Sequence, residues 1–178
     1  MNKILNRILK PSTLYKYLFN FSPMYIRSAG RIKYMSEDMF KVIVEIPLSY
    51  KNRNYVGTIF GGSLFSATDP VYMMQLIHIL GNEYVIWDKS ATIHYRKPAT
   101  EKAIALFEFK KEEIEQIIQN VKRQKEIAWK KELVITNTKG DIFCLLEREL
   151  YIADRFFYQE KMRIKKELEN KQNKKEVV

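Results

Sequence analysis

Residues 54–70 read Asn-Tyr-Val-Gly-Thr-Ile-Phe-Gly-Gly-Ser-Leu-Phe-Ser-Ala-Thr-Asp-Pro, a glycine turn followed by an apolar segment that carries one acidic side chain. The paired glycines Gly61 and Gly62 predict a turn at which a helix begins, and the apolar residues after them predict that this helix is buried. Burying a carboxylate is costly or raises its pKa. We therefore expect Asp69 to meet polar partners or to take part in chemistry.

The length of 178 residues and the hydrophobic content of 46% are typical of one globular domain. The net charge of +10 is concentrated at the two ends of the chain. Residues 1–33 contain seven Lys or Arg and no acid, and residues 155–178 contain eight basic and four acidic residues. Because the middle of the chain is almost neutral, the basic composition does not predict a nucleic-acid partner.

The composition divides the chain into three parts. Residues 1–30 are expected to form an N-terminal helical extension, with its helix from about Ser12 to Arg27. Residues 31–154 form the main domain, and residues 155–178 are expected to form a basic C-terminal helix that frays into a disordered tail over 171–178. The aromatic and basic character of the N-terminal part leaves open either docking on the domain core or peripheral contact with a membrane surface through the basic ends.

The single cysteine, Cys144, excludes an intramolecular disulfide and lies in the apolar run 142–146. A small buried thiol is the ordinary interpretation of such a position. This cysteine usage fits a reducing, cytoplasmic compartment. The apolar residues near the N-terminus are interrupted by polar and basic ones, so we expect no signal peptide, no membrane span and a soluble protein.

The hydrophobic pattern predicts strands, then a buried helix, then further strands. An antiparallel sheet wrapped around one long buried central helix satisfies this order, because the inner face of a lone sheet needs an apolar cover. The fold class is therefore α+β, with a hairpin turn at 137–141. The expected strands are 31–34, 40–46, 84–95, 102–109, 126–137 and 141–153, and the expected helices are 61–80 and 110–123.

The backbone amides at Gly61 and Gly62 could polarise a carbonyl, because they lie at the positive end of the predicted helix. If Gly62 and Asp69 share one helix, they lie roughly 10 Å apart at ~1.5 Å per residue. Both groups could then act on one carbonyl only if they come from different subunits. A two-fold dimer provides this arrangement twice.

The spacing of these residues resembles a known pattern. Asn54 is followed six residues later by Phe-Gly-Gly at 60–62 and then by Asp69, and a long strand follows with Lys-Ser-Ala-Thr-Ile-His-Tyr-Arg-Lys-Pro at 89–98. Over residues 31–153 the chain resembles the hotdog-fold thioesterases of the phenylacetic-acid (PaaI-like) type. It is most similar to the DUF4442 family, whose members resemble that hotdog domain.

The resemblance implies an acyl thioester hydrolase that forms a dimer or a dimer of dimers, with its active site at a subunit interface. Gly62 would stabilise the oxyanion, Asp69 would activate water and Asn54 would assist. The substrate would be an acyl-CoA or an acyl carrier protein, with coenzyme A only as part of the substrate and no other cofactor. The residues expected to bind the substrate are Phe60, Gly61, Ser63, Phe65 and Met73, together with Arg96 and Lys97 for phosphates, although solvent exposure alone also explains that basic pair.

Two residues leave alternatives open. The better-known relatives carry His where this chain has Phe60, which can neither donate nor accept a hydrogen bond, so a non-catalytic hotdog module that binds an acyl chain or a lipid is the alternative function. Pro70 makes Asp69 a candidate N-cap of a helix that begins at Pro70. His78 and His94 are interpreted as structural residues, and no metal site is expected.

Overall fold

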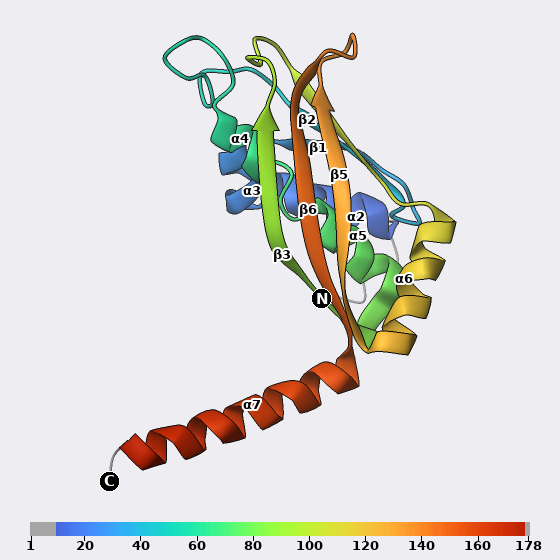
Figure 1. Cartoon of the computed structure of the whole chain (residues 1–178). Helices are drawn as coiled ribbons and strands as arrows, with labels where there is room; N and C mark the ends of the chain where they lie inside the picture. Colours follow the sequence, from blue (N-terminus) through green and yellow to red (C-terminus); the bar gives the residue numbers. More distant parts are fainter. Residues whose placement is uncertain (1–9, 177–178) are drawn as a thin grey trace.

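The structure, a computed structural model, describes residues 10–176. Figure 1 shows one sheet with helices packed against one of its faces. The strands are β1 (Arg31–Met35), β2 (Lys41–Ile46), β3 (Tyr84–Tyr95), β4 (Ala103–Glu108), β5 (Glu126–Thr136) and β6 (Ile142–Asp154). The helices are α2 (Pro11–Phe21), α3 (Pro23–Ser28), α4 (Gly61–Ser66), α5 (Val71–Leu80), α6 (Lys111–Gln124) and α7 (Arg155–Glu176), with a 3-10 turn η1 (Gly81–Glu83). The six strands are all antiparallel in the order β1-β2-β4-β5-β6-β3, which confirms the predicted α+β class.

The prediction of one long central helix is wrong, because the segment is divided into α4 and α5 by residues 67–70. Pro70 has no backbone N–H and disfavours the helical conformation of the residue before it. Val71 is therefore the first residue of α5, Pro70 occupies the N-cap, and no side chain caps the helix. This excludes the interpretation of Asp69 as the N-cap of a helix that starts at Pro70.

The two ends also differ from the prediction. The N-terminal segment forms two helices, because Pro23 ends the first and begins the second. Residues 1–9 of the predicted extension lie outside the described residues. The C-terminal helix α7 begins at Arg155 and continues to Glu176, past the expected end of the helix at residue 170. The disordered tail expected over 171–178 stays a prediction, and 177 and 178 lie outside the described part. Figure 1 shows that α7 extends away from the sheet.

The surface of the N-terminal helices carries apolar side chains. Leu18 and Phe21 of α2 and Met24 of α3 are exposed, next to the exposed Arg27. No helix in the described part of the chain is both long and apolar enough to cross a membrane. The predicted contact of the basic ends with a membrane surface is a different matter and stays a prediction.

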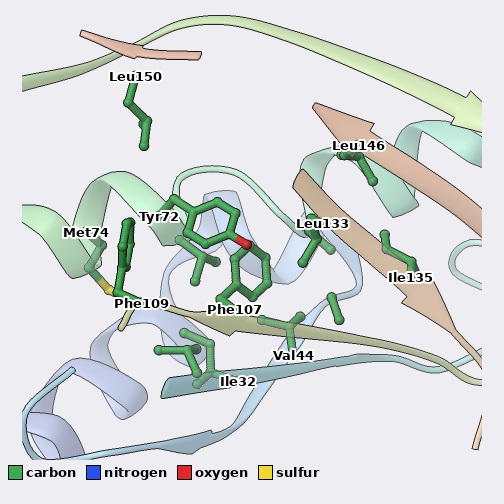
Figure 2. Packing of buried hydrophobic residues seen from close by; sticks show 14 of the residues in the cluster. Ile32, Val44, Tyr72, Met74, Phe107, Phe109, Leu133, Ile135, Leu146 and Leu150 are labelled. Carbon is green, nitrogen blue, oxygen red and sulfur yellow. The ribbon is translucent and has the colours of Figure 1, made fainter. Parts of the chain in front are cut away.

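The core lies between the sheet and α5. The ring of Tyr72 on α5 packs edge-on against Phe107 at 4.8 Å and Phe109 at 5.5 Å between ring centres. Figure 2 shows these rings beside Leu133 and Leu146 of the neighbouring strands. These contacts hold α5 against the sheet, and α4 enters the same core through buried Leu64.

The edge strand β3 changes its face at a bulge. Its pairing with β6 shifts between Asp88 and Ser90. Paired residues of antiparallel strands lie on the same face of the sheet. Asp88 therefore faces the helices, since it pairs with the buried Leu150, and after the bulge Tyr95 faces them as well, since it pairs with the buried Cys144. The middle of β3 and its C-terminal end thus each present a polar side chain to the helical layer.

The thiol of Cys144 is fully buried on β6, as predicted, and burial raises its pKa to about 12. The thiolate is the reactive form of cysteine. We expect the folded protein at pH 8 to resist a disulfide reagent such as DTNB, and the protein unfolded in guanidinium chloride to react with one equivalent. Rapid reaction of the native protein would show that Cys144 is accessible.

Candidate functional site

Four of the predicted site residues meet in one cleft of about 390 Å³ between α3, the loop after β2 and the start of α4. Ligand sites in proteins commonly have volumes of about 300–1,000 Å³, so the cleft is large enough for part of a small molecule. Its lining comprises Arg27, Lys51, Asn52, Arg53, Asn54, Phe60, Gly62, Ser63 and Ser66. The predicted site residues that lie outside this lining are Gly61, Phe65, Asp69, Met73, Arg96 and Lys97.

Asn54 organises the loop that forms one wall of the cleft. Its side-chain oxygen Oδ1 accepts hydrogen bonds from the amides of Val56 at 3.1 Å and Thr58 at 3.0 Å, and its Nδ2 donates to Thr58 Oγ1 at 2.9 Å. The loop then returns to the start of α4, where the amide of Phe60 donates to the carbonyl of Asn52 at 2.7 Å. Asn54 thus positions the beginning of α4, and a direct catalytic role for it stays a prediction.

The two glycines at the start of α4 leave backbone donors open. The amide of Ser63 donates to the carbonyl of Phe60 at 2.9 Å, whereas those of Gly61 and Gly62 find no acceptor among residues 10–176. The first N–H groups of a helix have no partner within the helix. Gly62 lines the cleft, so its amide is the donor that a ligand there could use.

An aromatic ring lies against each glycine. A Cβ atom on Gly62 would collide with the ring of Phe60, and one on Gly61 would lie 2.6 Å from the hydroxyl oxygen of Tyr95. Phe60 is 58% exposed, so its ring covers Gly62 from the solvent side. A side chain at either glycine would therefore have to displace an exposed ring, that of Phe60 or that of Tyr95.

Tyr95 is a site residue that the sequence reasoning missed. Partial burial, chiefly, and the nearby Cys144 raise the pKa of its phenol, so the hydroxyl stays protonated at neutral pH. The bulge in β3 directs this side chain towards α4, and local sequence does not show the bulge. Tyr95 thus adds a hydroxyl donor beside Gly61.

Asp69 lies on the surface at the break between α4 and α5 and is exposed in the chain. The expectation that the apolar segment buries this carboxylate is therefore wrong, because the interruption before Pro70 turns the side chain out of the core. Gly62 and Asp69 also do not share a helix, so the helical estimate of their separation does not apply.

A buried arginine connects this break to the sheet. Arg148 of β6 is only 3% exposed, and its Nη2 donates to Thr68 Oγ1 at 3.0 Å. Its Nη1 lies 3.6 Å from Asp88 Oδ1, and the guanidinium carbon lies 5.4 Å from the centre of the Phe65 ring. Sequence reasoning missed Arg148, although the inward positions of this strand are otherwise apolar and the single charge among them was a usable signal.

The surroundings of Asp88 raise the pKa of its carboxyl group. Burial raises its pKa most, the negative charge of Asp69 raises it further, and the cation of Arg148 opposes both effects. Two carboxylates therefore lie near each other beside the middle of β3, next to a buried guanidinium. In the described part of the chain, Arg148 Nε and Asp88 Oδ1 have no hydrogen-bond partner.

The strand β3 runs between the surroundings of Asp69 and the glycine turn. Asp69 lies beside Asp88, and Gly61 lies beside Tyr95. The seven positions from Asp88 to Tyr95 span roughly 20 Å at ~3.3 Å per residue. Within one chain, Asp69 and the glycine turn are therefore associated with different positions along β3.

The other residues that the sequence singled out lie outside the lining of the cleft. Arg96 and Lys97 are exposed at the end of β3, and Lys97 Nζ pairs with Asp141 Oδ1 at 3.0 Å. His78 packs edge-on against Tyr15, and His94 is exposed, 3.9 Å from Glu147. Among the described residues, no group of three or more His, Cys, Asp or Glu could hold a metal ion.

Comparison with known proteins identifies the fold. The model of a family named DUF4442, a domain of unknown function, matches residues 12–152. No curated protein matches the chain. A protein of unknown function from Pseudomonas aeruginosa, described as a probable thioesterase, is 18% identical, with a TM-score of 0.72 and coverage of 82% of this chain and 97% of that one.

Two other solved structures have the same architecture. A protein of unknown function from Chlorobaculum tepidum is 16% identical, with a TM-score of 0.65 and coverage of 81% of this chain and 94% of that one. A thioesterase from Haemophilus influenzae is 12% identical, with a TM-score of 0.58 and coverage of 80% and 90%. At identities this low the similarity shows the fold alone, and it confirms the predicted hotdog fold.

The buried ion pair predicts a large effect of removing Arg148. Arg148→Met leaves Asp88 partly buried without its cation, and we expect the free energy of unfolding to fall by about 3–5 kcal/mol. Urea unfolding measures this loss. The exposed cation on α6 offers a matched control, since Arg123→Met should change stability by less than about 0.5 kcal/mol.

The double variant Arg148→Met with Asp88→Leu tests the cause. It should recover part of the lost stability, because neither charge is then left without a partner. An Arg148→Met protein as stable as the wild type would show that the pair has no structural role.

Proposed function

Since this chain belongs to the DUF4442 family and has the hotdog fold, we propose that it is an acyl thioester hydrolase whose active site two subunits complete. The substrate is an acyl-CoA or an acyl carrier protein, and no cofactor is needed beyond the carrier itself. One observation carries the proposal. The amide of Gly62 is open in a cleft, while the carboxylate of Asp69 is exposed at the break between α4 and α5 and is not part of the lining of that cleft.

The chemistry requires an oxyanion donor and a base. The amide of Gly62 hydrogen-bonds the carbonyl oxygen of the thioester as negative charge develops on it. The carboxylate of Asp69 accepts a proton from a water molecule, which attacks the carbonyl carbon. Collapse of the tetrahedral intermediate breaks the C–S bond, and the proton returns to the departing thiolate. The products are a carboxylic acid and a thiol.

The unpaired edge of β3 offers a surface on which a second subunit could pair. This strand pairs only with β6 within the described chain, so its other side presents unpaired backbone groups. Two β3 strands that pair antiparallel across a two-fold axis would place the Asp88 end of one subunit beside the Tyr95 end of the other. Asp69 of one chain would then approach Gly62 of the second chain, and this geometry would occur twice in the dimer.

A non-catalytic acyl-chain or lipid binding module is the second candidate function, and Phe60 is the observation that favours it. The ring occupies the place of a histidine in the resembled pattern and lies against Gly62 without a hydrogen-bonding atom. Native mass spectrometry of the purified protein separates the two functions. Bound lipid together with no hydrolysis of any acyl-CoA chain length would favour the binding module.

Asp69→Asn should abolish most of the turnover, because the amide cannot accept the proton of the attacking water. We expect kcat for acyl-CoA hydrolysis to fall by on the order of 100-fold or more. Release of free thiol gives the rate, and light scattering verifies that the oligomer is unchanged. Glu115→Gln, an exposed acid on α6, is the matched control and should retain full activity. Undiminished hydrolysis by Asp69→Asn would exclude the mechanism.

Mixing two inactive variants tests the shared site. Gly62→Pro removes the proposed donor at an early helical position where proline is tolerated, and Asp69→Asn removes the base. A mixed dimer contains one site with both lesions and one intact site. After random exchange of subunits we therefore expect about a quarter of the wild-type activity.

The folded state of each variant is verified first by circular dichroism. No recovery from two folded and exchanging variants would show that one chain supplies both groups.

A further inference from the structure

Three cations surround the cleft that contains Gly62. Arg27 comes from the last turn of α3, and Lys51 and Arg53 come from the loop after β2. All three side chains are exposed, and no acidic residue lines the cleft with them. None of them forms an ion pair within residues 10–176, so their charges are available to an anion.

We propose that Arg27, Lys51 and Arg53 bind the phosphate groups of the carrier arm of the thioester substrate. This inference rests on the proposed function, because the thioester carbonyl must lie at Gly62 in the same cleft. The guanidinium group presents several N–H donors in a fork that matches phosphate oxygens, and lysine adds a point charge. Phosphate is common to coenzyme A and to the prosthetic arm of a carrier protein.

The site differs from the basic pair that the sequence suggested. Lys97 already forms an ion pair with Asp141, and this carboxylate reduces the attraction of Lys97 for a phosphate. Solvated cations on a convex surface are the ordinary alternative for any basic group. These three cations instead line one cleft, together with an open backbone donor and without a neutralising carboxylate. The segment 1–30, expected to be a mere extension, thus supplies Arg27 to the site.

Binding of coenzyme A itself tests the proposal without requiring catalysis. We expect the variant Arg27→Gln, Lys51→Gln, Arg53→Gln to bind coenzyme A at least tenfold more weakly in calorimetry. The control variant Lys122→Gln, Arg123→Gln, Lys125→Gln removes the same charge from exposed positions around the end of α6 and should bind like the wild type. Equal affinity of the wild type and the cleft variant for coenzyme A would overturn the proposal.

Comparing substrates with and without phosphate shows whether the cleft variant loses binding of the phosphate or of another part of the substrate. For acyl-CoA, the cleft variant should show a KM at least tenfold higher, whereas hydrolysis of an acyl-pantetheine, which carries no phosphate, should be unchanged. An equal effect on both substrates would contradict a phosphate site. If neither substrate is hydrolysed by the wild type, the proposed function fails, while weaker binding of coenzyme A by the cleft variant would still support the phosphate site.

Two further probes test which molecule supplies the phosphate. The first is holo acyl carrier protein, and the second is an anionic lipid surface. Tighter binding of holo acyl carrier protein than of coenzyme A, with both lost in the cleft variant, would assign the site to the carrier-protein arm. Vesicles with anionic lipid test a membrane surface instead. Loss of vesicle binding in the cleft variant, with unchanged affinity for coenzyme A, would refute the proposal in favour of a lipid surface.

Discussion

The buried guanidinium of Arg148 is the interaction on which the arrangement of the site depends. A buried charge must be compensated, and here Thr68 and Asp88 provide the partners from two different elements. Thr68 belongs to the break in the central helix, whereas Asp88 belongs to the edge strand. The ion pair and the hydrogen bond therefore hold the segment that contains Asp69 against the middle of β3, and the side chain of Asp69 itself remains exposed.

The length of β3 explains why the proposed chemistry needs two chains. Tyr95 at the C-terminal end of the strand lies against Gly61, and Asp88 near its middle lies close to Asp69. A rigid strand keeps these two positions apart within one subunit. A two-fold axis across the edge of β3 would place Asp88 of one subunit near the Tyr95 position of the other. The same strand thus separates the oxyanion donor from the carboxylate and offers the unpaired edge through which a second subunit would bring them together.

The cleft combines groups that are useful to different parts of one substrate. The open amide of Gly62 suits a carbonyl, and the cations beside it suit an anion at the other end of the same ligand. Phe60 lies against the glycine with a ring that packs but does not hydrogen-bond, so hydrogen bonding at this point comes from the backbone, and the Tyr95 hydroxyl lies next to the neighbouring Gly61. Burial keeps that hydroxyl protonated by raising its pKa.

By itself the sequence determined the six strands, the helix α6 and the glycine turn, because periodicity, prolines and glycines act on their immediate neighbours. It also indicated Asn54, Phe60, Gly62 and Ser63, which the loop brings into one cleft. Only the tertiary structure decided that Pro70 exposes Asp69, that a bulge turns Tyr95 towards Gly61, that Arg148 contacts Thr68 in the helix break, and that Arg27 lines the cleft. These features depend on strand register and on contacts between distant segments, which no local pattern contains.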